Sequence, residues 1–419
     1  MPPLITTHSL ADIAAKVEAG ERLTHDDGVR LYASRDIHEI GRMANLVRER
    51  LHGDAAYYNI NRHINYTNYC VLRCKFCSFY RPYPKAPSKT DTAHATDASS
   101  SAARDLSLLD PAEPDAYALD IETIVENAQT AADAGATEVH IVGGLHPTLP
   151  FSYYIDMCSA IRAACPRIHI KAFTAIEIIH FTRITKPRLS IREVLEQLRD
   201  AGLGSLPGGG AEIFDDRVHD EAYRNKVGEQ GWFDVHREAH SLGIPTNATM
   251  LYGHVERPEE RITHMLKLRD HQDASLQAMR EAMKDSPPPP VVGDSGCHRQ
   301  APLAGADHSP PPAAFNCFVP LSFIPDDSAL SHLPGPTGLD DLKTLAISRL
   351  MLDNIPHIKA FWIMQSAKLA QVSLNWGVDD LDGTVVHYDI TKRESGPGNR
   401  HQELSLGQLR CLIQESGRR

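Results

Sequence analysis

The strongest constraint on the fold is a regular alternation of short β-branched segments with longer amphipathic ones. The segment "EVHIVGG" precedes a helical pattern near residues 152–164, and "IHIKAFTA" precedes "IREVLEQLRDAG". The order continues through "SLPGG", "PTNATMLYG", "FNCFVPLSF" and "HIKAFWIM", with "YNINRHINYT" before these segments and "GTVVHY" after them. About eight βα units of this kind predict an α/β protein whose parallel sheet closes fully or nearly into a (β/α)8 TIM-type barrel. An open doubly wound sheet is the alternative, but no glycine-rich dinucleotide turn follows the first strand.

Composition divides the chain into a barrel region, two insertions and two terminal segments. Residues 1–50 predict N-terminal helices with Ile13, Ala14 and Val17 on one apolar face, and residues 51–394 predict the barrel. Residues 395–419 predict a tail with a terminal helix capped by Ser405. Within the barrel, residues 84–112 and 274–314 offer little to bury, so we expect two low-complexity surface insertions there.

The balance of charged residues limits the class of partner. The chain carries 43 basic and 54 acidic residues, a formal net charge of −11, which argues against binding to nucleic acid or to an anionic membrane. No apolar run reaches the length of about 18 residues that a span requires, and the first residues lack a basic and then apolar leader. We therefore expect no membrane span and a cytoplasmic location.

Three of the eight cysteines lie in the short segment "NYCVLRCKFCSFYR", directly after the first predicted strand. Cys70, Cys74 and Cys77 could converge on one soft metal site. Four thiolates would close a structural zinc site or an electron-transfer cluster, whereas three leave one iron of a cubane open for chemistry. The alternatives are an iron–sulfur electron carrier and a zinc site completed by His63 or by a distant cysteine. We interpret the other five cysteines as packing residues.

Glycines and polar side chains follow the next predicted strands, at the end where such barrels carry their active sites. In "GGLHP", Gly143 and Gly144 would let the backbone approach a ligand closely, with His146 as a polar neighbour. The third strand is predicted to end in "KAFTAIEI", where Glu177 is costly to bury unless it has partners. A simple turn and an exposed loop glutamate are the alternative interpretations.

Two further segments show the same pattern. In "SLPGGGAEIF" the glycines around Gly209 would let the backbone pass close to a ligand, and Glu212 could bind a ribose or an ammonium group. In "NATMLYGH" the polar residues Asn247, Thr249, Tyr252 and His254 alternate with apolar ones, so polar groups could point to one side of the fifth predicted strand. A flexible loop and a packing tyrosine are the alternatives.

The cysteine spacing, with Phe76 before the last cysteine, is similar to that of the radical S-adenosylmethionine (SAM) enzymes. The resemblance implies a 4Fe–4S cluster on Cys70, Cys74 and Cys77, whose open iron would bind SAM. It also implies a reductant of the flavodoxin or ferredoxin type. One electron from the reduced cluster would cleave SAM into methionine and a 5′-deoxyadenosyl radical.

The resemblance covers most of the chain outside the two insertions. The segments that carry it are "HIVGGLHPTLPFSYY", "IHIKAFTAIEI", "LGSLPGGGAEIF", "NATMLYGH", "HLPGPTGLDDLKTLAISRLMLDNIPHIKAFWIM" and "DDLDGTV". They resemble the aminodeoxyfutalosine synthases of the futalosine route to menaquinone. This implies that the radical adds to the small-molecule substrate 3-(1-carboxyvinyloxy)benzoate, giving 6-amino-6-deoxyfutalosine, methionine and CO2 or bicarbonate. The dehypoxanthine futalosine cyclases and the radical SAM subunits that make the deazaflavin FO are the neighbouring alternatives.

The resemblance also implies roles for individual residues. Gly143 and Gly144 match the loop that holds the methionine part of SAM. The residues expected to bind the cofactor are Phe76, Gly143, Gly144, Glu177, Gly209, Glu212 and Asn247, and those expected to be catalytic are Glu177, His146 and Tyr252. From loop position, Arg73, Arg81 and Lys171 are the cations expected near the substrate carboxylates.

Overall fold

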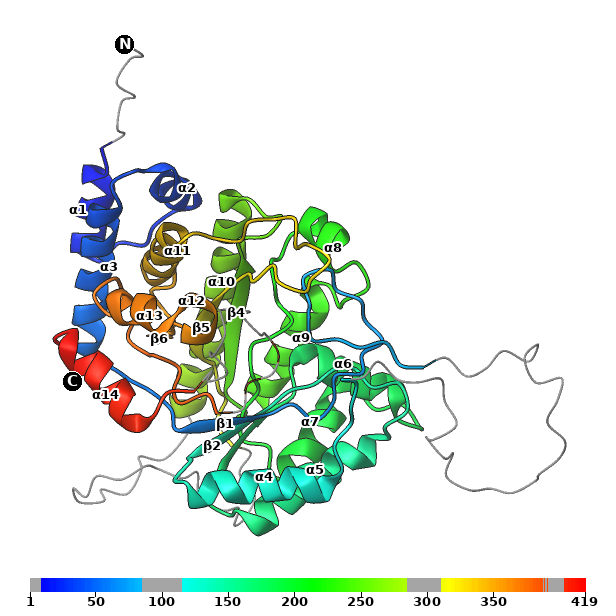
Figure 1. Cartoon of the computed structure of the whole chain (residues 1–419). Coiled ribbons are helices and arrows are strands. Elements are labelled where there is room, and N and C mark those ends of the chain that lie inside the picture. Colours follow the sequence, from blue (N-terminus) through cyan, green and yellow to red (C-terminus); the bar gives the residue numbers. More distant parts are fainter. Residues whose placement is uncertain (1–8, 85–114, 285–309, 387, 389, 391–402) are drawn as a thin grey trace, which may run out of the picture.

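The computed structural model describes residues 9–84, 115–284, 310–386, 388, 390 and 403–419 (Figure 1). Its strands are β1 (Asn61–Ile64), β2 (Glu138–Ile141), β3 (His169–Ala172), β4 (Thr246–Tyr252), β5 (Phe315–Ser322) and β6 (His357–Ile358). Its helices are α1 (Ala11–Ala19), α2 (His25–Ala33), α3 (Ile37–His52), α4 (Ile121–Asp133), α5 (Phe151–Ala164), α6 (Ala175–Ile184), α7 (Ile191–Asp200), α8 (Asp216–Ala222), α9 (Glu229–Ser241), α10 (Pro258–Lys284), α11 (Gly338–Met351), α12 (Trp362–Gln365), α13 (Ala367–Ser373) and α14 (Leu406–Glu415).

The strands form two parallel three-stranded sheets, in the orders β1-β2-β3 and β4-β5-β6. Single parallel bridges span the gaps between the two sheets. On one side Lys171 pairs with Ser205 and Leu206 pairs with Thr246, and on the other Lys359 pairs with Asp380 and Arg62 with Val386. Ser205 and Leu206 lie in the expected strand "SLPGG", and Val386 lies in "GTVVHY", whereas Asp380 precedes that segment. The strands therefore have a barrel-like parallel arrangement, but the continuous ladders do not close it.

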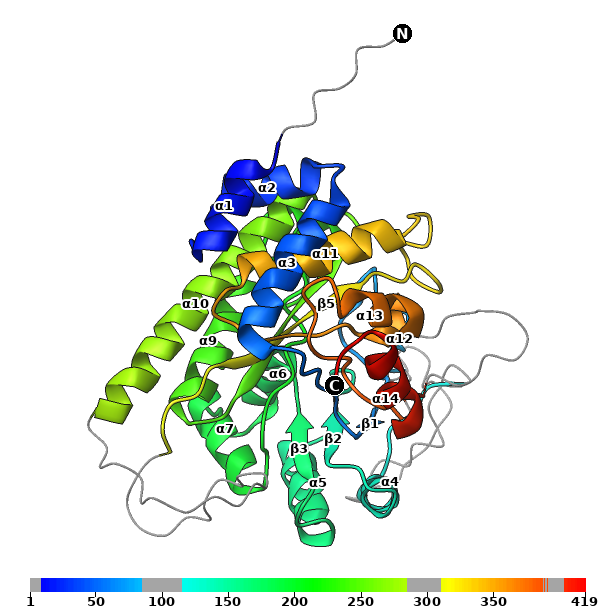
Figure 2. The same ribbon diagram turned by 90° about the vertical axis from the view of Figure 1, so that its left-hand side faces the viewer.

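The strands are buried on both faces, as is usual for a parallel sheet. Every residue of β4 is buried, because helices cover the outside of the sheet while the inner faces point at one another. Figure 2 shows the long helix α10 running along this outer side. Helix α7 is typical of the covering layer: Ser190 caps its first turn, and Val194, Leu195 and Leu198 bury one face.

Helix α6 differs from what the sequence predicts. The third strand ends at Ala172, and the residues that we expected to continue it begin a helix at Ala175. Residues 175–181 are all buried, so this helix lacks the polar face that makes a helical period visible in a sequence. The consequence is that Glu177 lies in the first turn of a helix.

The terminal segments are helical, as predicted. Helices α1 to α3 pack at one end of the molecule, with Ile13 and Val17 buried, and α14 begins at the capping residue Ser405 (Figure 2). Residues 274–284, which we assigned to the second insertion, instead form the end of α10. Residues 85–112 and 285–309 of the expected insertions lie outside the described residues, and the division into domains stays a prediction.

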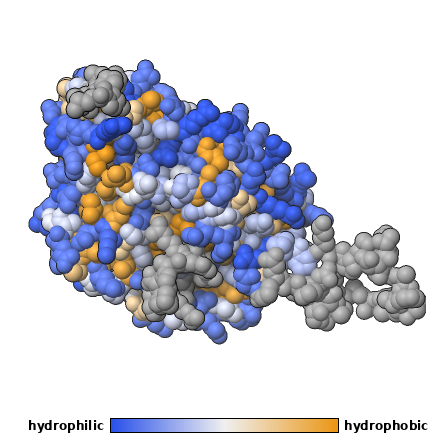
Figure 3. Space-filling model, turned by 45° about the horizontal axis from the view of Figure 1, so that its top comes forward, coloured by the Kyte–Doolittle hydropathy of each residue, from blue (hydrophilic) through white to orange (hydrophobic). Residues whose placement is uncertain are grey.

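The surface is mainly polar where it is described. On the face shown in Figure 3, hydrophilic residues predominate and the hydrophobic ones are scattered among them. Within the described ranges, no helix combines the length and the apolar character that crossing a bilayer would require.

Candidate active site

The three clustered cysteines lie on one loop that follows β1 at its carboxyl end. Cys74 is buried, while Cys70 and Cys77 are partly buried. The loop is held by its own backbone: the Cys70 N–H donates to the Arg81 carbonyl at 3.0 Å, and the Cys77 N–H donates to the Cys74 carbonyl at 3.1 Å. Burial raises the pKa of the Cys74 thiol to about 12. The loop thus presents three adjacent sulfurs that a metal would have to deprotonate on binding.

A buried cation stands beside the thiols. Lys226, in the turn between α8 and α9, donates to the Glu212 carboxylate in a short contact, and its ammonium lies 5.2 Å from the centre of the Phe76 ring. Burial by itself would lower the pKa of Lys226, but the Glu212 carboxylate and the nearby thiols together raise it. This ammonium is therefore a fixed positive charge next to the cysteine loop.

The GGLHP loop after β2 packs directly on the cysteine loop. A Cβ on Gly144 would lie 2.2 Å from the Tyr69 carbonyl oxygen, and one on Gly143 would lie 2.7 Å from the Tyr66 ring. The Gly144 N–H donates to the Thr67 carbonyl at 2.8 Å, and the Val71 N–H donates to the Leu145 carbonyl at 3.0 Å. Gly144 is therefore needed because two backbones run in contact, and Gly143 because the Tyr66 ring occupies the space of a side chain.

Glu177 fastens the GGLHP loop to the first turn of α6. Its Oε1 accepts from the Tyr66 hydroxyl at 2.7 Å and from the Gly143 N–H at 3.2 Å. Its Oε2 accepts from the Thr174 N–H at 2.7 Å and from the Thr174 hydroxyl at 2.8 Å. Burial raises the pKa of Glu177, and the Tyr66 hydrogen bond opposes this rise. All four contacts are internal, so Glu177 acts here as a positioning residue.

The glycine run after the fourth βα unit brings a loop against β4. A Cβ on Gly208 would lie 2.6 Å from the Asn247 carbonyl oxygen, and the Thr249 hydroxyl donates to the Gly208 carbonyl at 2.8 Å. Glu212 follows with a positive φ of 46° and is buried. Glycine is required where the two backbones meet, and Glu212 is turned towards Lys226.

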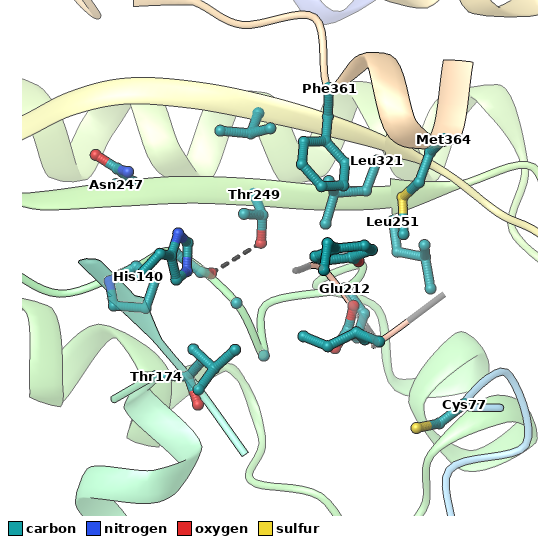
Figure 4. Close-up of a pocket in the computed structure, with 18 of the residues that line it drawn as sticks. Cys77, His140, Thr174, Glu212, Asn247, Thr249, Leu251, Leu321, Phe361 and Met364 are labelled. Carbon is teal, nitrogen blue, oxygen red and sulfur yellow. Dashed lines mark hydrogen bonds between the residues drawn. The ribbon is translucent and has the colours of Figure 1, made fainter. Parts of the chain in front are cut away.

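These loops surround a cavity of about 240 Å³ at the carboxyl ends of the strands. Its walls are mostly apolar and include Leu251, Leu321, Phe361 and Met364. In Figure 4, Cys77 stands on one side of the cavity, and His140 and Asn247 stand on the other. Of the expected site residues, the cavity lining includes Phe76, Cys77, Lys171, Gly209, Glu212 and Asn247.

The inner end of the cavity holds two stacked histidines. The rings of His63 and His140 lie 4.6 Å apart at an angle of 20°. Burial lowers the pKa of each to about 3. Beside them, the Lys171 ammonium donates to the Glu138 carboxylate at 2.8 Å. The expected cation Lys171 therefore borders the cavity but already has an anionic partner.

Two residues expected to be catalytic lie outside the cavity lining. His146 is buried, and its Nδ1 accepts from the N–H groups of Thr148 and Leu149 at 3.3 and 3.2 Å. The Tyr252 hydroxyl donates to the Asp341 carboxylate at 2.7 Å and lies 2.8 Å from the Ser322 hydroxyl. The contacts described for both side chains are internal to the protein.

Two expected substrate cations also lie outside this cavity. Arg73 is exposed on the outer side of the cysteine loop. The Arg81 Nε donates to Asp115 at 2.9 Å, and its Nη1 donates to the carbonyls of Ser78 and Tyr80. In this structure Arg81 stabilises the cysteine loop.

Sequence reasoning missed three residues that shape the site. Lys226 is separated from the cysteines by about 150 residues, and nothing in "RNKVGE" distinguishes it from a surface lysine. His140 alternates with apolar residues in β2, which signals an inward or outward face but not a cavity. Tyr66 was visible only as part of a strand, and its role depends on the distant Glu177.

The cysteines suit a cluster better than a single zinc ion. In a tetrahedral zinc site the sulfurs stand about 3.8 Å apart, from Zn–S bonds of about 2.3 Å. Among the residues with described side chains, the only trio of His, Cys, Asp or Glu whose ligand atoms all lie within 4.8 Å is His52, His357 and Asp379. The three loop sulfurs are therefore spread more widely than one zinc ion would hold them, and a larger centre fits this donor set.

Comparisons with known proteins place the chain in the radical SAM superfamily. Residues 64–268 match the family model described as the radical SAM superfamily, and residues 312–417 match the CofH/MqnC C-terminal region. A protein of Thermus thermophilus named aminodeoxyfutalosine synthase is 38% identical over 413 residues, covering 98% of this chain and 92% of the relative. One of Streptomyces coelicolor with the same name is 36% identical, covering 97% and 90%. The crystal structure of methylornithine synthase (PylB) has a TM-score of 0.61 over 97% of this chain and 95% of that one, at 15% identity, which is a likeness of fold alone.

Proposed function

The chain belongs to the aminodeoxyfutalosine synthases within the radical SAM superfamily, and we propose that it makes 6-amino-6-deoxyfutalosine for menaquinone biosynthesis. Its co-substrates would be SAM and 3-(1-carboxyvinyloxy)benzoate, and its other products methionine and CO2 or bicarbonate. The observation that carries this proposal is the loop of three cysteines at the mouth of an apolar cavity.

Cys70, Cys74 and Cys77 would hold a 4Fe–4S cluster, with the Lys226 ammonium offsetting part of its negative charge. When bound, the cluster and SAM would supply a 5′-deoxyadenosyl radical for addition to the vinyl ether of the substrate. The apolar walls would exclude water from the reacting groups, as a reactive radical requires.

The polar groups around the cavity mouth would orient SAM. Gly143 and Gly144 lie in contact with the cysteine loop, which supports a role for their backbone in holding the methionine part. Glu212 and Asn247 line the cavity and could bind the ribose or the ammonium group. Because Glu212 already pairs with Lys226, its carboxylate is fixed in place before any ligand binds.

Three further expectations, on the barrel, the reductant and the cellular location, are part of the same proposal. A closed barrel of eight βα units is supported by the single parallel bridges on both sides of the two sheets. A flavodoxin or ferredoxin would deliver the electron, and the enzyme would act in the cytoplasm.

Turnover under anaerobic conditions tests the proposal. The cluster-reconstituted enzyme is reduced with dithionite, supplied with SAM and 3-(1-carboxyvinyloxy)benzoate, and its products are identified by mass spectrometry. We expect a nucleoside with the mass of 6-amino-6-deoxyfutalosine and an equal amount of methionine. Cys77→Ala should abolish the product, whereas Cys158→Ala, in the buried face of α5, should retain it.

The proposal is wrong if SAM is cleaved only to 5′-deoxyadenosine while the benzoate is recovered unchanged. Such a result would indicate that the enzyme catalyses a different reaction of the same superfamily. Product formation by the Cys77→Ala variant would instead reject the three-cysteine cluster.

A further inference from the structure

The inner end of the cavity contains a histidine without a hydrogen-bond partner. His63 is 4% exposed and lines the cavity, and neither ring nitrogen has a partner among the described residues. Buried polar atoms are almost always paired, so a buried imidazole that lines a cavity and has both nitrogens unpaired points to a missing hydrogen-bond partner.

The ring of His63 is fixed by its neighbours. His140 stacks on it at 4.6 Å, and the edge of Tyr388 meets it at 5.2 Å and an angle of 89°. Since burial lowers the pKa of both histidines far below neutrality, each ring is neutral at pH 7 and offers one N–H donor. The pair is therefore a pre-oriented set of donors at the inner end of the cavity.

The ammonium groups around the pair are already held by carboxylates. Lys171 pairs with Glu138, and the Lys359 ammonium lies 3.3 and 3.2 Å from the Asp380 and Asp382 carboxylates. Among the described residues, the ring nitrogens of His63 are the unpaired buried atoms of this pair, and the N–H of the neutral ring can donate to a hydrogen-bond acceptor. A carboxylate is such a group, and hydrogen bonds to a charged acceptor are stronger than those to a neutral one.

The proposed reaction fixes the direction in which the substrate lies, and the inference rests on that reaction. The vinyl carbon that reacts must stand at the end of the cavity near Cys77, where the cysteine loop lies. The carboxylate on the benzoate ring is the substrate group farthest from that carbon. In Figure 4, His140 stands across the cavity from Cys77, and the apolar side chains of Leu321 and Phe361 also line the cavity.

We propose that His63 and His140 form the subsite that binds the ring carboxylate of the substrate. The subsite selects a meta-carboxylated phenyl ether over a plain one, and it sets the distance between the vinyl carbon and the cysteine loop. His63 is thus a substrate-binding residue that determines specificity, while the reaction takes place at the other end of the cavity.

A substrate lacking one group tests this assignment. The reconstituted enzyme and its His63→Phe variant are compared with the full substrate and with 2-phenoxyacrylate, which lacks the ring carboxylate. With the full substrate, we expect kcat/KM of the variant to fall about ten- to a hundredfold, the scale of one hydrogen bond to a charged group. With 2-phenoxyacrylate, the kcat/KM values of the two enzymes should agree within about threefold, because this substrate has no ring carboxylate for His63 to bind.

Two variants control for structural damage. His271→Phe makes the same substitution at a partly buried histidine outside the cavity lining, whose Nε2 also lacks a partner, and it should leave the preference for the carboxylated substrate unchanged. His63→Gln restores an amide N–H and should recover part of that preference. The substrate Kd, measured by calorimetry without turnover, should follow the same order.

The subsite is rejected if His63→Phe weakens both substrates equally, or neither. If His63→Phe does not fold, His63→Gln carries the test, and equal losses for both substrates reject the subsite. Failure of the wild-type enzyme to form the nucleoside from the full substrate would reject the proposed function instead, so the two failures are distinguishable.

Discussion

The Glu177 carboxylate accepts four internal hydrogen bonds, and replacing it with an amide gives a quantitative prediction. In Glu177→Gln one oxygen becomes an NH2 donor, which must face either Thr174 or the pair of donors from Tyr66 and Gly143. The hydroxyls can rotate, so one backbone N–H is left without an acceptor. An unpaired buried donor costs about 1–3 kcal/mol. Glutamine carries no charge, and burial of the Glu177 charge is unfavourable, so part of this cost is offset. We expect the free energy of unfolding to fall by about 2 kcal/mol.

Glu193 provides the matched control. It occupies the same position in a capping box, with Ser190 in α7, but it is exposed and touches no distant loop. Because glutamine also completes a capping box, Glu193→Gln should cost about 0.5 kcal/mol or less. Urea unfolding of the metal-free proteins, followed by circular dichroism, gives both values.

The same substitution should loosen the contact between the GGLHP loop and the cysteine loop. We therefore expect Glu177→Gln to retain less iron per chain than Glu193→Gln after identical reconstitution. Equal stability and equal iron content in the two variants would refute the positioning role of Glu177.

Three further predictions concern the cysteine loop and the buried charges. Gly144→Ala places a Cβ 2.2 Å from the Tyr69 carbonyl oxygen and should lower both the free energy of unfolding and the iron content. Gly407→Ala, whose Cβ would have no atom closer than 4.0 Å, should lower neither. Equal iron content in the two variants would contradict this prediction. Lys226→Met leaves Glu212 buried and unpaired, and should lower the free energy of unfolding in urea by about 3–5 kcal/mol. The double variant that also carries Glu212→Gln should recover most of this loss. No recovery would refute the pairing. Burial lowers the pKa of three histidines, His63, His140 and His264, to about 3. Between about pH 6.5 and 3 the unfolded chain therefore binds more protons than the folded one. The free energy of unfolding should be lower at pH 5 than at pH 7 by about 2 kcal/mol per histidine. Urea midpoints that stay constant from pH 7 to 5 would contradict that burial effect.

The sequence predicts those parts of the site that depend on neighbouring residues. The cysteine spacing, the glycine pairs and the βα alternation are local patterns, and the structure contains the corresponding loop, close backbone contacts and parallel strands. Local reasoning also identified Glu177 as costly to bury without partners, and the structure supplies four donors.

Contacts between distant segments could not be predicted in this way. Whether Lys226 faces the thiols, or Arg81 faces Asp115, depends on how helices and loops pack. Lys226 looks like an ordinary surface cation in sequence, and Arg81 was expected to face the substrate. The same holds for the His63–His140 stack, which exists because β1 and β2 are aligned so that these two residues are partners. Helix α6 was missed because it is buried on all sides over its first two turns.

The central claim is that three cysteines hold a cluster with one iron left for SAM. Mössbauer spectroscopy of the 57Fe-reconstituted enzyme, recorded with and without SAM, tests it most directly. We predict that SAM changes the signal of one of the four iron sites and leaves the other three as they were. Spectra that SAM does not alter, or a fresh anaerobic preparation that contains zinc in place of iron, would contradict the claim.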